Sequence, residues 1–168
     1  PRIKRSSVNW KKGEAGYGDE KPSPLSYRTN NFSPKDEPCF SFRTNKNTHN
    51  IILDNLSSSA MYSGEKMATG PRYCPSIEDK VYKFNQNPSH LLQLEPEWTM
   101  SEQIYVNGFS TSLEEKIQLK SLKTVSGLED VEFIRPGYAI EYDFFYPSQL
   151  KNTLESKAIS GLFMAGEK

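Results

Sequence analysis

The stretch "QIYVNGFSTSLEEKIQLKSLKTVSG", Gln103 to Gly127, carries the clearest strand and helix signals in the chain. Its first seven residues form a strand candidate that contains the turn-forming pair Asn107-Gly108. Ser112 and Glu115 have the spacing of a capping box, and Gly127 is a typical helix stop. The apolar side chains of the predicted helix share one face: Leu113, Ile117 and Leu122. A strand followed by a capped helix predicts a domain with both kinds of element.

The flanking sequence adds further short elements of both kinds. One helix is predicted with Asn47 or Thr48 as N-cap, and another starts at Ser76, which with Asp79 approximates a capping box. The strand candidates are short segments: residues 39–44, residues 90–96, two strands in residues 131–147 bent at Pro136-Gly137, and the apolar run 159–166. The predicted fold class is therefore α+β, with mixed strands and short helices.

Residues 1–38 are polar and rich in proline and glycine, which predicts an extended arm with little regular structure. Four prolines lack a backbone donor, so a central strand is not expected around them. They are Pro22, Pro24, Pro34 and Pro38.

The bulk composition excludes several classes of protein. Lys and Arg together number 21, as do Asp and Glu, so the net charge of the 168 residues is zero. A dedicated nucleic-acid module usually has an excess of positive charge, although a local basic patch in a neutral protein stays compatible with these numbers. No apolar run approaches the roughly 20 residues that cross a bilayer. The two cysteines and two histidines lack zinc-ligand spacing, so no metal site is predicted.

The stretch "GPRYCPSIEDK", Gly70 to Lys80, contains the main candidate site residue, Cys74. Most free cysteines are small buried hydrophobic residues, and Cys74 can be one of them. Arg72 and the start of the predicted helix both favour a thiolate, which is the nucleophilic form of cysteine. Packing and nucleophilic catalysis therefore both remain open on the residues alone.

Other candidates have simpler explanations. Glu78 and Asp79 could act as a general acid and base, but acidic residues are also favoured in the first turn of a helix. Gly16 and Gly18 have neither the third glycine nor the preceding strand of a phosphate loop. The tyrosines of the last predicted strands could stack on a base or a flavin ring, or simply pack: Tyr138, Tyr142 and Tyr146.

Six motifs occur in a fixed order: "AMYSG", "GPRYCPSIEDK", "LEPE", "IYVNGFSTSL", "IRPGYAIEYD" and "LESKAISGLFMAG". With these motifs the chain resembles the glucose-inhibited division protein A family of tRNA uridine 5-carboxymethylaminomethyl modification enzymes. The resemblance runs from about Pro1 to Gly166 and is most specific from Met61 onward.

The resemblance implies an FAD-dependent Rossmann-like flavoprotein with an inserted domain, which modifies the wobble uridine of certain tRNAs. It also implies NADH as reductant, a GTPase partner, a homodimer, and a bacterial cytoplasmic location or else a mitochondrial or plastid one. The match places Cys74 at a proposed catalytic cysteine of the family. The alternative is a non-catalytic RNA-docking or protein-interaction module derived from that family. A glycine-rich FAD fingerprint in the upstream reading frame would favour the enzyme.

The sequence departs from the family pattern in ways that suggest a central fragment. The glycine-rich FAD fingerprint and the family's other proposed catalytic cysteine are absent, Trp98 stands where a glycine is common, and Glu167-Lys168 replaces the usual flavin-binding continuation. We expect three parts: an inserted region with the arm (1–71), an α+β body with the Cys74 motif (72–158), and a return strand of the FAD domain (159–168). No cofactor-binding residue is assigned.

An incomplete FAD site predicts that the 168-residue chain, expressed alone, is colourless. Without a glycine loop to approach the pyrophosphate, the flavin would be lost on purification. The absorbance of the purified chain between 350 and 500 nm checks this expectation. A stoichiometric flavin spectrum would contradict it.

Overall fold

A six-stranded antiparallel sheet organises the larger part of the chain, in the order β2-β3-β4-β5-β1-β6. The computed structural model describes residues 1–59, 62, 76–139 and 145–165. The strands are β1 (Arg2–Lys4), β2 (Glu14–Gly16), β3 (Cys39–Arg43), β4 (Leu91–Pro96), β5 (Gln103–Asn107) and β6 (Phe133–Arg135). The helices are α1 (Lys46–Asp54), α2 (Ile77–Lys83) and α3 (Glu115–Leu122), with 3-10 turns at Arg5–Ser7, Trp10–Lys12, Leu56–Ser58 and Pro147–Gln149. The predicted α+β class is confirmed.

The chain divides into two compact units. The first comprises Pro1–Glu65 and Arg72–Ala139, and the second comprises Lys66–Pro71 and Ile140–Lys168. The sheet and the three helices belong to the first unit. The three-part division of the chain at residues 71 and 158, which concerns a longer flavoprotein, stays a prediction.

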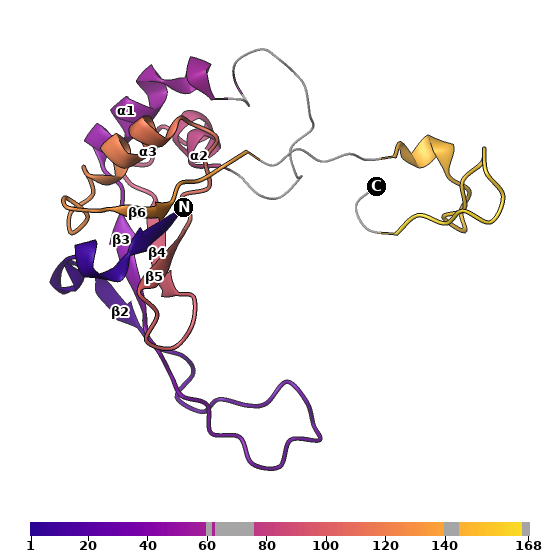
Figure 1. Ribbon diagram of the computed structural model, residues 1–168, viewed down its shortest axis with the longest axis horizontal. Coiled ribbons are helices and arrows are strands. Elements are labelled where there is room, and N and C mark those ends of the chain that lie inside the picture. The colour runs from indigo at the N-terminus through magenta and orange to yellow at the C-terminus, as the bar shows by residue number, and fades with distance from the viewer. Residues whose placement is uncertain (60–61, 63–75, 140–144, 166–168) are drawn as a thin grey trace. The chain divides into compact units, whose positions relative to one another are not determined.

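One face of the sheet supplies the core. Leu92 and Leu94 of β4 are fully buried, whereas Leu91 and Gln93 of the same strand are exposed, which is the period-2 alternation of a sheet with one covered face. Leu94 lies opposite Val106 of β5, which is also fully buried. Each helix adds buried apolar side chains to the same core: Ile52 from α1, Ile77 and Val81 from α2, and Leu122 from α3. Figure 1 shows these three helices grouped together.

The expectation of an unstructured arm over residues 1–38 is wrong for its first sixteen residues. Strand β1 lies between β5 and β6, with Ile3 opposite Ile104 and Phe133, and Ile3 is fully buried. Strand β2 pairs with β3. Three-residue strands carry too little periodicity to be seen in sequence, and their stability comes from the neighbouring strands. Residues 17–36 contain no helix or strand, as predicted, and form a loop that projects from the β2–β3 end of the sheet (Figure 1).

The helix starts test the predicted caps. Ser76 is the N-cap of α2, and its Oγ accepts the N–H of Asp79 at 3.1 Å, as predicted. Helix α1 is capped by Asn45 rather than Asn47 or Thr48, and Thr48 completes the capping box. Helix α3 begins at Glu115 with no side-chain cap, so the predicted Ser112 cap is wrong. The backbone N–H of Ser112 bonds to Glu78 instead, and Thr111 Oγ1 accepts from Leu113, which forms a local turn in place of a first helical turn.

The predicted apolar strand over residues 159–166 is wrong over the part that the structure describes. Only Phe163 pairs there, in an isolated bridge to Glu155. Gly161 has φ +79°, a left-handed conformation that interrupts an extended run, and its N–H bonds to the Glu155 carboxylate at 2.8 Å. The first of the two strands predicted around Pro136 is β6, and the second falls largely on residues 140–144, outside the described residues.

The buried position of Ile3 generates a prediction. Ile3→Ala should lower the free energy of unfolding by about 3 kcal/mol, because it removes apolar contacts from a fully buried site and leaves a cavity in the core beside the sheet. Urea unfolding of the 168-residue chain measures this difference. Ile134→Ala is the matched control, since Ile134 lies on the adjacent strand β6 and is exposed. Equal losses in both variants would contradict the central place of β1.

Candidate functional site at the start of helix α2

Helix α2 is fixed in place by the segment that follows β5. The backbone N–H of Ile77 donates to the carbonyl of Ser110 at 2.7 Å, and Lys80 Nζ donates to the carbonyl of Gly108 at 3.2 Å. Gly108 has φ +88°, and a Cβ there would lie 2.6 Å from the carbonyl oxygen of Leu91. The glycine of the predicted Asn107-Gly108 turn is therefore required both by its conformation and by the close approach of β4.

The carboxylate of Glu78 is the polar centre of this region. Glu78 is fully buried, and its Oε1 accepts the backbone N–H of Ser112 at 3.0 Å and the hydroxyls of Ser59 and Ser112 at 3.2 and 3.4 Å. Its Oε2 has no hydrogen-bond partner among the described residues. Glu78 and Asp79 do lie in the first turn of α2, as predicted. The burial of Glu78 was not predicted: the first turn packs on residues 110–113, so the carboxylate leaves water and takes protein donors.

Asp79 faces a different set of partners. The hydroxyl of Tyr62 donates to Asp79 Oδ1 at 2.7 Å, and Lys83 lies 2.9 Å from the same oxygen, one turn further along α2. Burial and the hydrogen bond to Asp79 both raise the pKa of Tyr62 above its usual value, so Tyr62 stays a neutral donor. The ring of Tyr62 packs against that of Tyr82, with centroids 5.7 Å apart. This hydrogen bond therefore joins Tyr62 to α2.

The "IRPGYAIEYD" motif is linked to the segment after β5 through Gln118 of α3. Gln118 Nε2 donates to the carbonyls of Leu113 and Gly137 at 2.7 and 2.9 Å, and its Oε1 accepts the N–H of Gly137 at 2.8 Å. Gln118 is buried, and a Cβ on Gly137 would approach Thr111 and Gln118 to 3.0 and 3.2 Å. The "IRPGY" stretch is thus tied to the "FSTSL" stretch by one side-chain amide.

The two histidines form a separate buried pair. Their ring centroids are 5.1 Å apart, and His49 Nε2 lies 2.8 Å from Thr44 Oγ1. Burial, together with the neighbouring positive charge of Lys80 for His90 and of His90 for His49, lowers the pKa of each ring, which favours the neutral forms. Among the described residues, no group of three or more His, Cys, Asp or Glu is arranged to hold a metal ion.

The predicted site residues are not all visible. Cys74, Arg72 and Tyr142 lie outside the described residues, so the state of the Cys74 thiol stays a prediction. Tyr138 and Tyr146 are exposed rather than packed in the core, and Arg135 lies over the Tyr138 ring at 5.1 Å. The free thiol of Cys39 lies on β3, where burial and nearby carboxylates raise its pKa.

Sequence reasoning missed Ser59, Gln118 and the burial of Glu78. Ser59 directly precedes the "AMYSG" motif, and Gln118 lies in the predicted helix after Ser112. Nothing in a single polar residue indicates its distant partner. A signal existed for Gln118, since it follows Ile117 on the flank of the apolar face. Glutamine at that position can enter the core only if backbone groups meet both ends of its amide.

Taken together, these features define an α+β segment in which hydrogen bonds link four motifs that are remote in sequence: "AMYSG", "GPRYCPSIEDK", "IYVNGFSTSL" and "IRPGYAIEYD". They surround the short helix α2, whose N-cap Ser76 follows Cys74 by two residues. The chain belongs to the glucose inhibited division protein A family, because the model of that family matches residues 1–168. No helix in the described part of the chain is both long and apolar enough to cross a membrane.

Individual relatives agree with the family match. The chain is 48% identical over 167 residues to the tRNA uridine 5-carboxymethylaminomethyl modification enzyme MnmG of Thermodesulfovibrio yellowstonii, and 50% identical over 167 residues to that of Bacillus licheniformis. In both comparisons 99% of this chain is covered, but only 27% of the relative. The crystal structure of Aquifex aeolicus GidA superposes with a TM-score of 0.84 at 41% identity, over 96% of this chain and 28% of that one. The chain thus spans about a quarter of its relatives.

The hydrogen bonds of Glu78 generate a stability prediction. Glu78→Ala should destabilise the chain by about 3 kcal/mol, because it leaves the N–H of Ser112 without its acceptor and removes the carboxylate to which the hydroxyls of Ser59 and Ser112 donate. Glu78→Gln keeps one carbonyl oxygen as acceptor and should cost less than half as much. Thermal and urea unfolding of both variants measure the difference.

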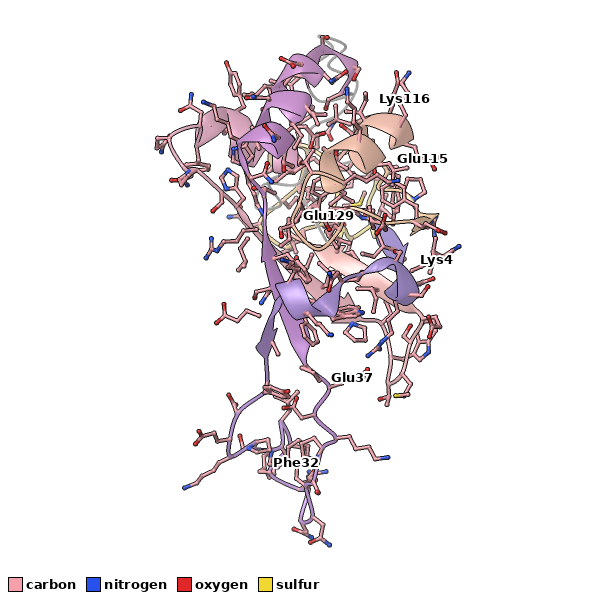
Figure 2. All side chains as sticks on the ribbon, turned by 90° about the vertical axis from the view of Figure 1, so that its left-hand side faces the viewer. Lys4, Phe32, Glu37, Glu115, Lys116 and Glu129 are labelled. Carbon is pink, nitrogen blue, oxygen red and sulfur yellow. The ribbon has the colours of Figure 1, made fainter. Side chains whose placement is uncertain are left out.

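Glu115→Ala is the matched control for this prediction. Glu115 is also an acidic residue in the first turn of a helix, but it is exposed (Figure 2) and should tolerate the change with little effect. Equal losses for Glu78→Ala and Glu115→Ala would show that the contribution of Glu78 is only that of a first-turn charge.

Proposed function

We propose that this chain is the part of a tRNA-modifying enzyme that presents Cys74 to the wobble uridine. The enzyme would place a carboxymethylaminomethyl group on C5 of the uracil at position 34. The observation that supports this proposal is the family match over residues 1–168, joined to 48–50% identity with enzymes that bear this activity in their names. Because the chain spans about a quarter of those enzymes, the activity is assigned to the complete protein.

The chemistry explains why a cysteine is useful here. C5 of uracil is a weak nucleophile, and addition of a thiolate to C6 turns C5 into an enolate-like carbon that can attack an electrophilic one-carbon unit. Loss of the C5 proton and departure of the thiolate then restore the uracil ring. A thiolate at Cys74 would be favoured by the positive charge of Arg72, two residues away in sequence. In the competing role, a neutral Cys74 thiol would donate a proton at C5.

The anchoring of α2 supports either role. Ser76 begins the helix two residues after Cys74, and its neighbours Ile77 and Glu78 are held by Ser110 and Ser112. An anchored helix turn that begins two residues after Cys74 would help to position the thiol. Fixed positioning is what a covalent step at a single ring carbon requires.

The cofactor and partners of this proposal belong to the complete protein. Bound FAD would supply the redox chemistry, with NADH as the reductant. The complete enzyme would act as a homodimer with a GTPase partner. Its location would be the bacterial cytoplasm, or else a mitochondrion or plastid. The described residues do not fit an FAD pyrophosphate site by themselves. Asp36 occupies the space beside Gly18, and Asn45 and Ser76 cap the starts of α1 and α2 with their own side chains. No step is assigned to the flavin through these residues.

Substitution of Cys74 in the complete enzyme tests the proposal. Cys74→Ser and Cys74→Ala should abolish formation of the modified wobble nucleoside, because neither side chain supplies a thiolate or thiol. FAD content and melting temperature should stay close to those of the parent enzyme. Nucleoside mass spectrometry of the tRNA product measures the modified nucleoside. Flavin absorbance measures the FAD content, and thermal unfolding measures the melting temperature.

Cys39→Ser is the matched control, since Cys39 is the other cysteine of the chain and its thiol pKa is raised rather than lowered. It should leave modification unchanged. Normal modification in both Cys74 variants would end the catalytic hypothesis. A loss of activity that only follows a loss of stability would assign Cys74 to packing.

A further inference from the structure

The loop tip, Lys21–Lys35 with the sequence "KPSPLSYRTNNFSPK", differs from the rest of the chain in charge. It contains three cations, Lys21, Arg28 and Lys35, and no acidic residue, whereas the whole chain has 21 residues of each sign. None of these three cations forms an ion pair with a described residue. The neutral net charge of the chain therefore hides a local positive segment at the end of the β2–β3 loop.

The same segment exposes large apolar side chains. Tyr27 is 92% exposed, Phe32 is 44% exposed, and Leu25 is fully exposed. The guanidinium of Arg28 lies 5.9 Å from the centre of the Tyr27 ring, so a cation and an aromatic face are presented side by side. A single exposed apolar side chain needs no explanation, but several on one short loop are typical of a surface that binds a partner.

The acidic residues beside the tip hold its base. Asp36 Oδ2 accepts the N–H of Gly18 at 3.0 Å, which closes the loop across its two ends. Glu37 lies 3.3 Å from Arg5 Nη1 and accepts the N–H of Met100 at 3.2 Å. Figure 2 shows Glu37 where the loop joins the sheet and Phe32 far out on the loop. Asp19 and Glu20 end the acid-free stretch on the other side.

We propose that the loop tip is a docking arm for single-stranded RNA. Cations pair with phosphates, and aromatic rings stack on unpaired bases, which is the combination that single-strand binders use. Double-stranded RNA offers its backbone but no free base faces, so it would leave the aromatic side chains without a role. Pro22, Pro24 and Pro34 restrict the free loop and so lower the entropy lost on binding. The inference rests on the proposed function, in which the unpaired anticodon bases of a tRNA are the natural occupant.

Two sets of substitutions in the complete enzyme test the arm. The charge variant combines Lys21→Ala, Arg28→Ala and Lys35→Ala, and the stacking variant combines Tyr27→Ala and Phe32→Ala. Binding of an unmodified tRNA transcript and of a 12-nucleotide oligo(U) is measured by fluorescence anisotropy from 50 to 300 mM salt. Wobble nucleoside formation is measured in parallel.

The charge variant should bind both RNAs about tenfold or more weakly at 0.1 M salt, and the slope of log K against log salt should fall by about 2, since each single-strand phosphate contact contributes about 0.7. The stacking variant should weaken oligo(U) binding at least about fivefold for each ring removed and leave the salt slope unchanged.

Matched controls separate local from general effects. Lys46→Ala with Lys120→Ala and Lys123→Ala removes the same charge from exposed positions on or next to α1 and α3, and Phe84→Ala removes an exposed aromatic ring. These controls should keep the parent affinities, and all variants should keep the parent melting temperature.

The outcomes distinguish the arm from the function. Unchanged RNA affinities in the arm variants, with normal modification by the parent enzyme, would overturn the arm and leave the function standing. Lower activity at unchanged RNA affinity would assign the loop to a protein partner and also overturn the arm. Absence of modification by the parent enzyme would overturn the function, while loss of oligo(U) binding in the arm variants would still support the arm.

Discussion

The fold depends on the hydrogen bonds that other segments form with the region between β5 and α3, because the backbone polar groups of this region lie in a packed interior and need partners. Residues 108–113 lie in no helix or strand ladder, yet Phe109, Thr111 and Leu113 are buried. The partners come from elsewhere: Ile77 for Ser110, Lys80 for Gly108, Glu78 for Ser112 and Gln118 for Leu113. A buried peptide group without such a partner would cost free energy comparable to a lost hydrogen bond. Hydrogen bonds to residues 108–112 thus fix the position of α2.

The sheet obeys a similar constraint. Strand β5 would be an edge with open N–H and C=O groups if β4 were its only neighbour, and β1 covers that edge with residues from the very start of the chain. Strand β6 then pairs with the other side of β1, so residues 2–4 join β5 and β6. These two strands are about 30 positions apart in sequence, and they lie roughly 100 and 130 positions after β1. Contacts of such sequence separation depend on pairing with the neighbouring strands and not on local sequence preference.

This difference between local and distant causes explains what the sequence could predict. The sequence predicts Ser76 as a cap because Ser76 and Asp79 are only three residues apart, and it predicts strands β3, β4 and β5 because each alternates within a few residues. Ser112 has the same local signature but is not a cap, because both its N–H and its hydroxyl bond to Glu78, 34 positions earlier. Strand β1 and the buried state of Glu78 have no local signal at all. The candidate cysteine was found from its motif, whereas the groups that anchor its helix required the fold.

Acidic and basic residues differ in their contacts between the body of the chain and the loop tip. Three acidic residues make contacts inside the body or at the base of the loop: Glu78, Asp36 and Glu37. The cations of the loop tip have no such contacts among the described residues, so their charge stays available to a partner. Chemistry that must be positioned to a fraction of an ångström belongs on anchored elements, and capture of a flexible strand belongs on an exposed loop. An overall charge of zero is therefore compatible with an RNA substrate, since phosphate groups respond to charges within about a Debye length and not to the sum over the molecule.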